Sequence, residues 1–198
     1  MRYANITRVD QTPDWEKVEV LSIDNQVWSV PVDIIPQAQI AYNDDSIFVR
    51  LKAREQNIRN EESGPIGMPC KDSCLEFFFC PEPDSNRYFN IEFNPGCCMF
   101  LGIGTGKHDL VRLLPMNDVF SPESSVGDGE WEICYTIPVR FIRSFFPRFR
   151  PERGGLMRAN FYKCGDLTDQ VHYFSWSPMS PEVKGFHDPS KFGMLEFE

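Results

Sequence analysis

Short runs in which apolar and polar residues alternate recur along the chain. The clearest run, 88–94, has an apolar side chain at every second position: Phe89, Ile91 and Phe93. The positions between them carry polar or hydroxylated side chains: Tyr88, Asn90, Glu92 and Asn94. Alternation with a period of two is typical of a strand with one face in a core. Further alternating or short apolar runs predict strands at 47–54, 73–80, 98–104, 131–137, 156–163 and 192–197.

Turn-forming residues separate these runs. An Asn-Asp-Asp turn at 43–45 joins 39–42 to 47–54 and predicts a hairpin. Segment 61–69 is rich in chain breakers, and 118–130 is rich in Ser, Gly and acidic residues, so both are predicted to be loops. Strands at regular intervals with turns between them predict an all-β fold, an antiparallel β-sandwich of jelly-roll-like form.

Only 139–146 has a helical pattern. Its apolar residues form one stripe at helical spacing: Phe141, Ile142, Phe145 and Phe146. Pro147 ends the pattern, so we expect one short helix here. No repeat or low-complexity segment divides the chain, and residues 1–198 are expected to form a single domain.

The net charge and the hydropathy of the chain limit the classes of partner that it can bind. A formal net charge of −9 argues against a nucleic-acid surface, because phosphate binding relies on clustered Lys and Arg. No segment approaches the roughly 20 apolar residues of a membrane span, and the start of the chain lacks the apolar run of a leader. We therefore expect no nucleic-acid or membrane partner, and a cytoplasmic location unless a leader precedes the given sequence.

The seven cysteines do not suggest a disulfide framework. Their number is odd and no two form a Cys-x-x-Cys pair: Cys70, Cys74, Cys80, Cys97, Cys98, Cys134 and Cys164. The three histidines are scattered, so the sequence predicts no zinc site. Reduced, partly buried thiols are the expected state.

Strands 73–80 and 88–94 carry the first candidate site. Neighbouring strands of a hairpin share faces, so four polar side chains are expected together on the face opposite the phenylalanines: Glu76, Asn90, Glu92 and Asn94. A sugar hydroxyl both donates and accepts hydrogen bonds, which suits carboxylates and amides in one patch. An ordinary polar sheet face is the simpler alternative.

A second group of candidates lies nearer the C-terminus. Arg158 and Tyr162 share one side of strand 156–163, and the planar fork of an arginine can hold hydroxyls or an acidic sugar. Trp176 stands between two serines near a strand end. Its ring can stack on the C–H face of a pyranose or belong to the core.

Five segments in this order resemble carbohydrate-binding module family 9-like proteins. They are DSCLEFF (72–78), YFNIEFN (88–94), RANFYKCGD (158–166), SWSP (175–178) and FHDPSKFG (186–193). The resemblance runs from about Gln39 to the C-terminus. It implies a β-sandwich that holds the reducing end of a sugar between two tryptophans, with acidic and amide groups around its hydroxyls.

Within this resemblance, Glu76 corresponds to the sugar-contacting acid and Trp176 to the later tryptophan of the clamp. The position of the earlier tryptophan is Pro69, so half of the clamp is missing, and Tyr88 or Tyr162 is the expected substitute. The resemblance also implies structural calcium, for which the candidate ligands are Asp24, Asp44, Asp45 and Asp166. The sequence itself requires no cofactor.

Three functions remain open at this stage. The favoured one is non-catalytic binding of a mono- or oligosaccharide, with a glycan-degrading enzyme as a partner. A glycoside hydrolase is the second, because Glu76 and Glu92 can supply the two carboxylates that such an enzyme needs. The third is a protein-interaction sandwich that has lost its sugar site, which the proline at position 69 favours.

Overall fold

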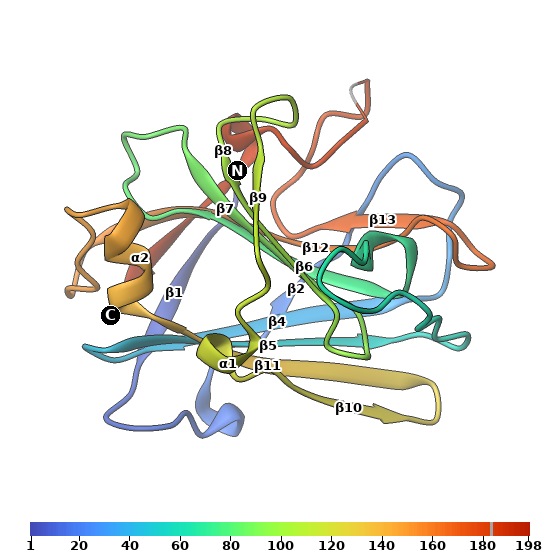
Figure 1. Ribbon diagram of the computed structural model, residues 1–198, viewed down its shortest axis with the longest axis horizontal. Coiled ribbons are helices and arrows are strands. Elements are labelled where there is room, and N and C mark those ends of the chain that lie inside the picture. Colours follow the sequence, from blue (N-terminus) through green and yellow to red (C-terminus); the bar gives the residue numbers. More distant parts are fainter. Residues whose placement is uncertain (183) are drawn as a thin grey trace.

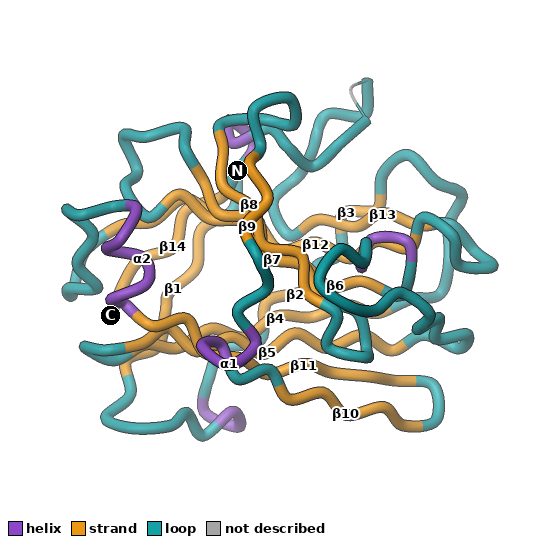
Figure 2. Tube along the Cα trace, in the orientation of Figure 1, coloured by secondary structure: helices purple, strands orange, loops and turns teal. Residues whose placement is uncertain are grey.

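Strands dominate the computed structural model, which describes residues 1–182 and 184–198 (Figure 2). The strands are β1 (Tyr3–Arg8), β2 (Leu21–Ser22), β3 (Asn25–Gln26), β4 (Ile35–Tyr42), β5 (Ser46–Arg54), β6 (Cys74–Cys80), β7 (Tyr88–Phe93), β8 (Met99–Gly104), β9 (Val111–Leu113), β10 (Glu123–Gly127), β11 (Glu130–Pro138), β12 (Leu156–Gly165), β13 (His172–Ser175) and β14 (Gly193–Phe197). The helices are α1 (Asn117–Phe120) and α2 (Val139–Phe145), with single 3-10 turns η1 (Trp15–Lys17), η2 (Pro69–Lys71) and η3 (Pro189–Lys191). No helix in the described ranges is long and apolar enough to cross a membrane.

The strands form one curled sheet that folds over itself into two layers (Figure 1). One layer has the order β10-β11-β5-β4, and the other has β14-β12-β6-β7-β8-β9. Strand β1 joins them, because it pairs with β14 through 3–6 and with β4 through 7–8. Both of these pairings are parallel. The all-β expectation is therefore confirmed, but the sheet is mixed and the strictly antiparallel arrangement was wrong.

Every strand predicted from the sequence is present, and one segment predicted to be a loop also forms a strand. The hairpin of β4 and β5 turns where expected, with Tyr42 opposite Ile47. Segment 118–130, predicted to be a loop, instead holds the end of α1 and the strand β10. Strand β10 pairs with β11, yet nearly all of its side chains are exposed. An edge strand that buries nothing leaves no apolar alternation in the sequence.

The main core lies between the two layers. Strands β5 and β11 turn their alternate aliphatic and aromatic residues toward it, and β6, β7 and β12 supply phenylalanines from the other side. Phe93 and Tyr135 meet across the layers with ring centroids 4.9 Å apart. Phe77 stacks on Phe161 of the neighbouring strand at 4.7 Å.

The outer face of the β6-β7-β12 layer is covered as well. Every residue of β6, β7 and β8 is buried, so neither face of these strands is open to solvent. A second apolar cluster on this outer face includes Phe78, Tyr88, Tyr162, Phe186 and Phe192. Segments from distant parts of the chain cover the layer here, and they leave a cavity above the strands.

Candidate functional site

A cavity of about 540 Å³ lies over the outer face of β6, β7, β8 and β12. The strands supply its floor: Glu76, Asn90, Glu92, Phe100 and Cys164. Connecting segments supply its walls and rim: Trp28, Met68, Cys70, Lys107, Leu110, Asp166, Lys184, Gly185, Phe186 and His187, together with Tyr173 of β13. Polar groups at the base and aromatic rings around them are the usual composition of a small-molecule site.

Two carboxylates lie side by side on this floor. Glu76 of β6 is directly opposite Glu92 of β7 in the sheet register. Asn90 lies one pleat away from Glu92, and its Nδ2 donates to Glu92 Oε1 at 3.0 Å. Asn90 Oδ1 and Glu92 Oε2 have no hydrogen-bond partner among the described residues, although both atoms are buried. Buried polar atoms are almost always paired, so these two oxygens are positioned for a ligand that donates hydrogen bonds.

Burial changes the protonation of the pair. It raises the pKa of Glu76 well above its usual range, and the neighbouring Glu92 carboxylate raises it further. Burial also raises the pKa of Glu92 to about 7, against the opposing effect of the Asn90 hydrogen bond. A carboxyl that keeps its proton can donate a hydrogen bond, whereas an ionised one only accepts. The pair therefore offers both kinds of partner near neutral pH.

Aromatic rings form one wall of the cavity. Trp28 packs edge-on against Tyr173, with ring centroids 6.1 Å apart, and in a tilted arrangement against Phe186, with centroids 5.5 Å apart. Its Nε1 donates to Ser180 O at 3.0 Å, which fixes the plane of the indole. Trp28 also has a φ of 57°, in the left-handed region that a bulky residue rarely adopts. Strain of this kind is typical of functional positions.

Charged and polar groups lie around the rim. Lys184 is exposed and places its Nζ 4.3 Å from the centre of the Tyr173 ring. The Tyr173 hydroxyl donates to Asp166 Oδ1 at 2.9 Å. His187 Nδ1 lies 2.8 Å from the Tyr88 hydroxyl, and burial lowers the pKa of this histidine to about 4. His187 is therefore neutral at physiological pH.

Three of the seven sequence-predicted site residues line the cavity, namely Glu76, Asn90 and Glu92. The structure does not bring the other four to it. Asn94 is fully buried and anchors the preceding loop: its Nδ2 donates to Asp72 Oδ2 and Glu62 O, both at 2.8 Å. Its Oδ1 accepts from two backbone amides, so no hydrogen-bonding capacity is left for a ligand.

Arg158 and Tyr162 support neighbouring segments. Arg158 donates to Pro189 O at 3.1 Å, to Asn86 Oδ1 at 3.1 Å and to Ser85 O. Tyr162 is fully buried, and its ring stacks on Phe186 with centroids 4.1 Å apart. Because Phe186 lines the cavity, Tyr162 positions the wall without forming it.

Trp176, assigned to the sugar clamp, belongs to the core. It is 2% exposed and packs edge-on against Phe161 at 5.9 Å. A Cβ at Gly193 would lie 2.4 Å from its ring, so β14 passes directly against the indole. The ring has no free face for a sugar. Tyr88, the other suggested substitute for the missing tryptophan, is also fully buried and lies outside the cavity lining.

The sequence reasoning missed the aromatic wall. Trp28 lies just after β3, between Val27 and Ser29, outside every segment that the sequence predicted to be a strand. Pro69, which replaces a tryptophan in the resemblance, is buried in η2. The wall is built from 28, 173 and 186, three positions far apart in the chain, and no local pattern connects them.

The calcium candidates do not gather in one place. Asp24 pairs with Arg2 at 2.5 Å and Asp44 with Arg8 at 2.9 Å, while Asp166 is at the cavity rim. Within the described residues, one group of three or more metal-binding side chains is close enough to share an ion: Cys74, Glu76 and Cys164. Thiols are poor calcium ligands, so calcium stays a prediction without a site.

Comparison with known proteins decides the family. The model of carbohydrate-binding family 9 matches residues 7–197. The chain belongs to carbohydrate-binding family 9. The family 9 resemblance seen in the sequence is thereby confirmed, over more of the chain than the motifs covered.

Solved structures agree with this family 9 membership. A putative carbohydrate-binding protein from Bacteroides uniformis is 29% identical, with a TM-score of 0.83, and the match covers 100% of this chain and 99% of that one. A family 9 module from Caldicellulosiruptor kristjanssonii in complex with glucose is 12% identical, with a TM-score of 0.72 and coverage of 100% and 96%. A family 9 module from the same organism in complex with cellotriose is 11% identical, with a TM-score of 0.73, and the match covers 100% of this chain and 94% of that one. The comparison with curated proteins finds no match.

Proposed function

We propose that this family 9 protein binds a mono- or oligosaccharide in the cavity over β6, β7 and β12, without catalysing a reaction. The single observation that carries the proposal is the floor of the cavity, where Asn90 Oδ1 and Glu92 Oε2 are buried without a partner in the part of the chain that the structure describes. Sugar hydroxyls can satisfy both oxygens. The chain would act beside a glycan-degrading enzyme, as suits a binding module.

The walls suit a sugar as well as the floor does. Each pyranose has an apolar C–H face, which the Trp28, Tyr173 and Phe186 rings can cover. Glu76 and Glu92 then meet the hydroxyl groups at the edge of the ring. The volume of about 540 Å³ falls within the range of roughly 300–1,000 Å³ typical of small-ligand sites.

We also propose that the cavity takes the end of a glycan chain rather than its middle. The carboxylates lie on a buried floor, with exposures of 2% for Glu76 and 7% for Glu92, so a ring that contacts them points inward. Oligosaccharides reduced to an alditol at the terminal ring test this point. If the reducing end enters, the alditol binds at least tenfold more weakly than the intact sugar.

Calorimetric titration with neutral and acidic mono- and oligosaccharides, including glucose and cellotriose, tests the proposal. We expect Trp28→Ala to lower the affinity at least tenfold. The matched control is Trp15→Ala, because Trp15 is also half-buried but lines a separate hollow near β4 and β5. If the wild-type protein binds none of these sugars measurably, the result would contradict the proposal and favour the protein-interaction alternative.

Hydrolysis is the second candidate, since the two adjacent carboxylates both have raised pKa values. A glycosidase needs one carboxyl that keeps its proton and one that is ionised. Incubation of the protein with chromogenic glycosides measures this directly. Release of the chromophore that stops in Glu92→Gln would replace the binding proposal with an enzymatic one, and we expect no release.

A further inference from the structure

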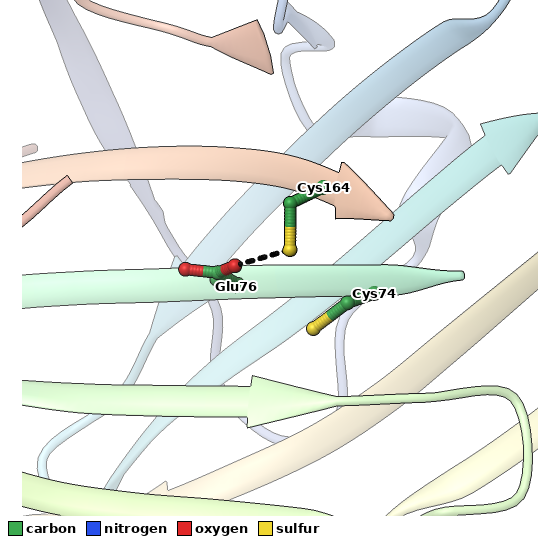
Figure 3. Close-up of side chains that lie close together, drawn as sticks. All are labelled: Cys74, Glu76 and Cys164. Atoms are coloured by element: carbon green, nitrogen blue, oxygen red, sulfur yellow. Dashed lines mark hydrogen bonds between the residues drawn. The ribbon is translucent and has the colours of Figure 1, made fainter. Parts of the chain in front are cut away.

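Two cysteines and a glutamate lie close together on the paired strands β6 and β12 (Figure 3). Cys74 of β6 is directly opposite Cys164 of β12 in the antiparallel register. Glu76 lies two residues along β6, on the same face of the sheet as Cys74. The Cys164 thiol is 2.9 Å from Glu76 Oε1, and one ligand atom from each residue lies within 4.8 Å of the other two.

We propose that Cys74, Glu76 and Cys164 form a site for a divalent cation of the zinc class. The three side chains are 0%, 2% and 2% exposed, so the cation would be held inside the protein. Cys164 and Glu76 line the cavity, which gives the ion an entry path and leaves a fourth coordination position facing the cavity. The cation site does not depend on the proposed sugar binding.

The donor atoms decide the class of metal. Two thiolates with one carboxylate suit zinc or cadmium, whereas calcium and magnesium require oxygen ligands. Zinc ligands at about 2.0–2.3 Å in tetrahedral geometry are separated from one another by about 3.5–3.8 Å. The three ligand atoms lie within 4.8 Å of one another, and the Cys164 Sγ–Glu76 Oε1 pair is 2.9 Å apart, so the set is compact enough to close around one ion. Binding would release the two thiol protons and the proton of the Glu76 carboxyl to solvent and involve no redox change.

The electrostatic surroundings favour a cation. Glu76 and Glu92 are adjacent and buried, and no lysine or arginine in the described residues forms an ion pair with either. The nearest buried ammonium, Lys163, contacts Glu55 and His172 on the other face of β12. Ionising both of these adjacent buried carboxyls without a cation is costly, and a divalent ion at Glu76 would offset the cost of ionising that carboxyl.

Sequence spacing gave no sign of this site, because its two cysteines belong to different strands. The Cys-x-x-Cys and His-rich patterns used to recognise zinc place ligands within a few residues of one another. Here the register of β6 and β12 brings the thiols together. The same pairing also suits a cross-strand disulfide, so the experiment has to separate these two outcomes.

The test is titration of the fully reduced protein with cadmium, followed by ultraviolet absorption of the cadmium–thiolate bond, in the absence of sugar. We expect one equivalent to bind with the absorption of two thiolates, and excess zinc to lower the apparent affinity for cadmium by competing for the same site. Cys74→Ser and Cys164→Ser should each lower the affinity at least a hundredfold, and Glu76→Gln about tenfold. Cys134→Ser is the matched control, because Cys134 is a half-buried thiol on β11 in the other layer.

Three results would overturn the proposal: no thiolate absorption in the wild type, an affinity equal in wild type and Cys164→Ser, or an equal loss in Cys134→Ser. Circular dichroism of each variant guards against loss of fold. Glu76→Gln retains the shape of the side chain and keeps the test open if a serine variant unfolds. Mass spectrometry of air-exposed protein detects the disulfide, and a cross-link that reductant cannot reverse before titration would also exclude the metal site.

Discussion

Strand β12 separates two buried polar clusters that differ in how completely they are paired. On its core side, Lys163 Nζ lies 3.2 Å from Glu55 Oε2 and 2.7 Å from His172 Nε2. Trp131 Nε1 donates to Glu55 Oε1 at 2.6 Å. On its cavity side, the cluster of Glu76, Asn90 and Glu92 retains two buried oxygens without partners within 1–182 and 184–198.

The difference separates a structural role from a binding role. Unpaired burial of a polar atom is costly, so a cluster that only stabilises the fold is expected to be fully paired. The Lys163 cluster meets this condition: burial and the adjacent ammonium lower the pKa of His172 to about 4, and the neutral ring accepts the lysine's hydrogen bond. The cavity cluster does not meet it, and a ligand has to supply the missing partners.

The largest expected effect is on the paired cluster. Lys163→Met leaves Glu55 as an uncompensated buried charge, which should lower the free energy of unfolding by about 3–5 kcal/mol. Urea unfolding measures the change. The control is Lys52→Met, because the Lys52–Glu130 pair is partly exposed and contributes less than about 1 kcal/mol. Equal losses in the two variants would show that the Lys163 cluster is not a special feature of the fold.

Low pH should lower the free energy of unfolding through His187, a residue that lines the cavity. The pKa of His187 is lowered from 6.5 to about 4 by burial, so its neutral form stabilises the fold above pH 6.5 and this contribution is lost as pH falls toward 4. At pH 4.5 we expect a loss of about 2 kcal/mol relative to pH 7. Urea unfolding of wild type and His187→Gln at both values isolates this contribution, since glutamine cannot be protonated. An identical pH dependence in the two proteins would contradict it.

Glu92→Gln tests the cavity cluster, for which we expect a loss of sugar affinity with little loss of stability, the opposite of the effect expected in the Lys163 cluster. The change removes an acceptor needed by the ligand, so sugar affinity should fall at least tenfold, or about 1.4 kcal/mol. The free energy of unfolding should stay within about 1 kcal/mol of wild type, because the lost carboxylate has no partner at Oε2. Glu132→Gln on β11, in the other layer, is the control for affinity. A large loss of stability in Glu92→Gln would show that the cavity cluster stabilises the fold as the Lys163 cluster does, and would contradict its separate binding role.

The sequence predicted the layers better than the cavity, for a physical reason. Alternation reports which side chains face a core, and it placed Phe89, Ile91 and Phe93 correctly. The pairing of the 73–80 and 88–94 strands likewise brought Glu76 and Glu92 together in register. Both predictions depend only on geometry within one strand or one hairpin.

Predictions that depend on contacts between distant segments did less well. Nothing local distinguishes Glu92, which lines the cavity, from Asn94, which anchors a loop, because the alternation of 88–94 places both on the same face of the predicted strand. Trp176 likewise shares its strand-end position with residues that face either side, and the passage of β14 beside it decides that it is core. The segments that cover the outer face determine which polar residues meet a ligand. No periodic pattern in the sequence predicts the path of these segments.

Arg158→Ala has the smallest expected effect on stability, and it tests the role that the sequence assigned to Arg158 against the role that the structure shows. The sequence placed Arg158 at the sugar site, whereas the structure engages its guanidinium with Ser85, Asn86 and Pro189. Loss of these bonds from a half-buried side chain should lower the free energy of unfolding by about 1 kcal/mol and leave sugar affinity unchanged. Calorimetry and urea unfolding on the same preparation measure both. If affinity falls while stability holds, the guanidinium reaches the ligand, and the segment at 184–189 moves to admit it when sugar binds.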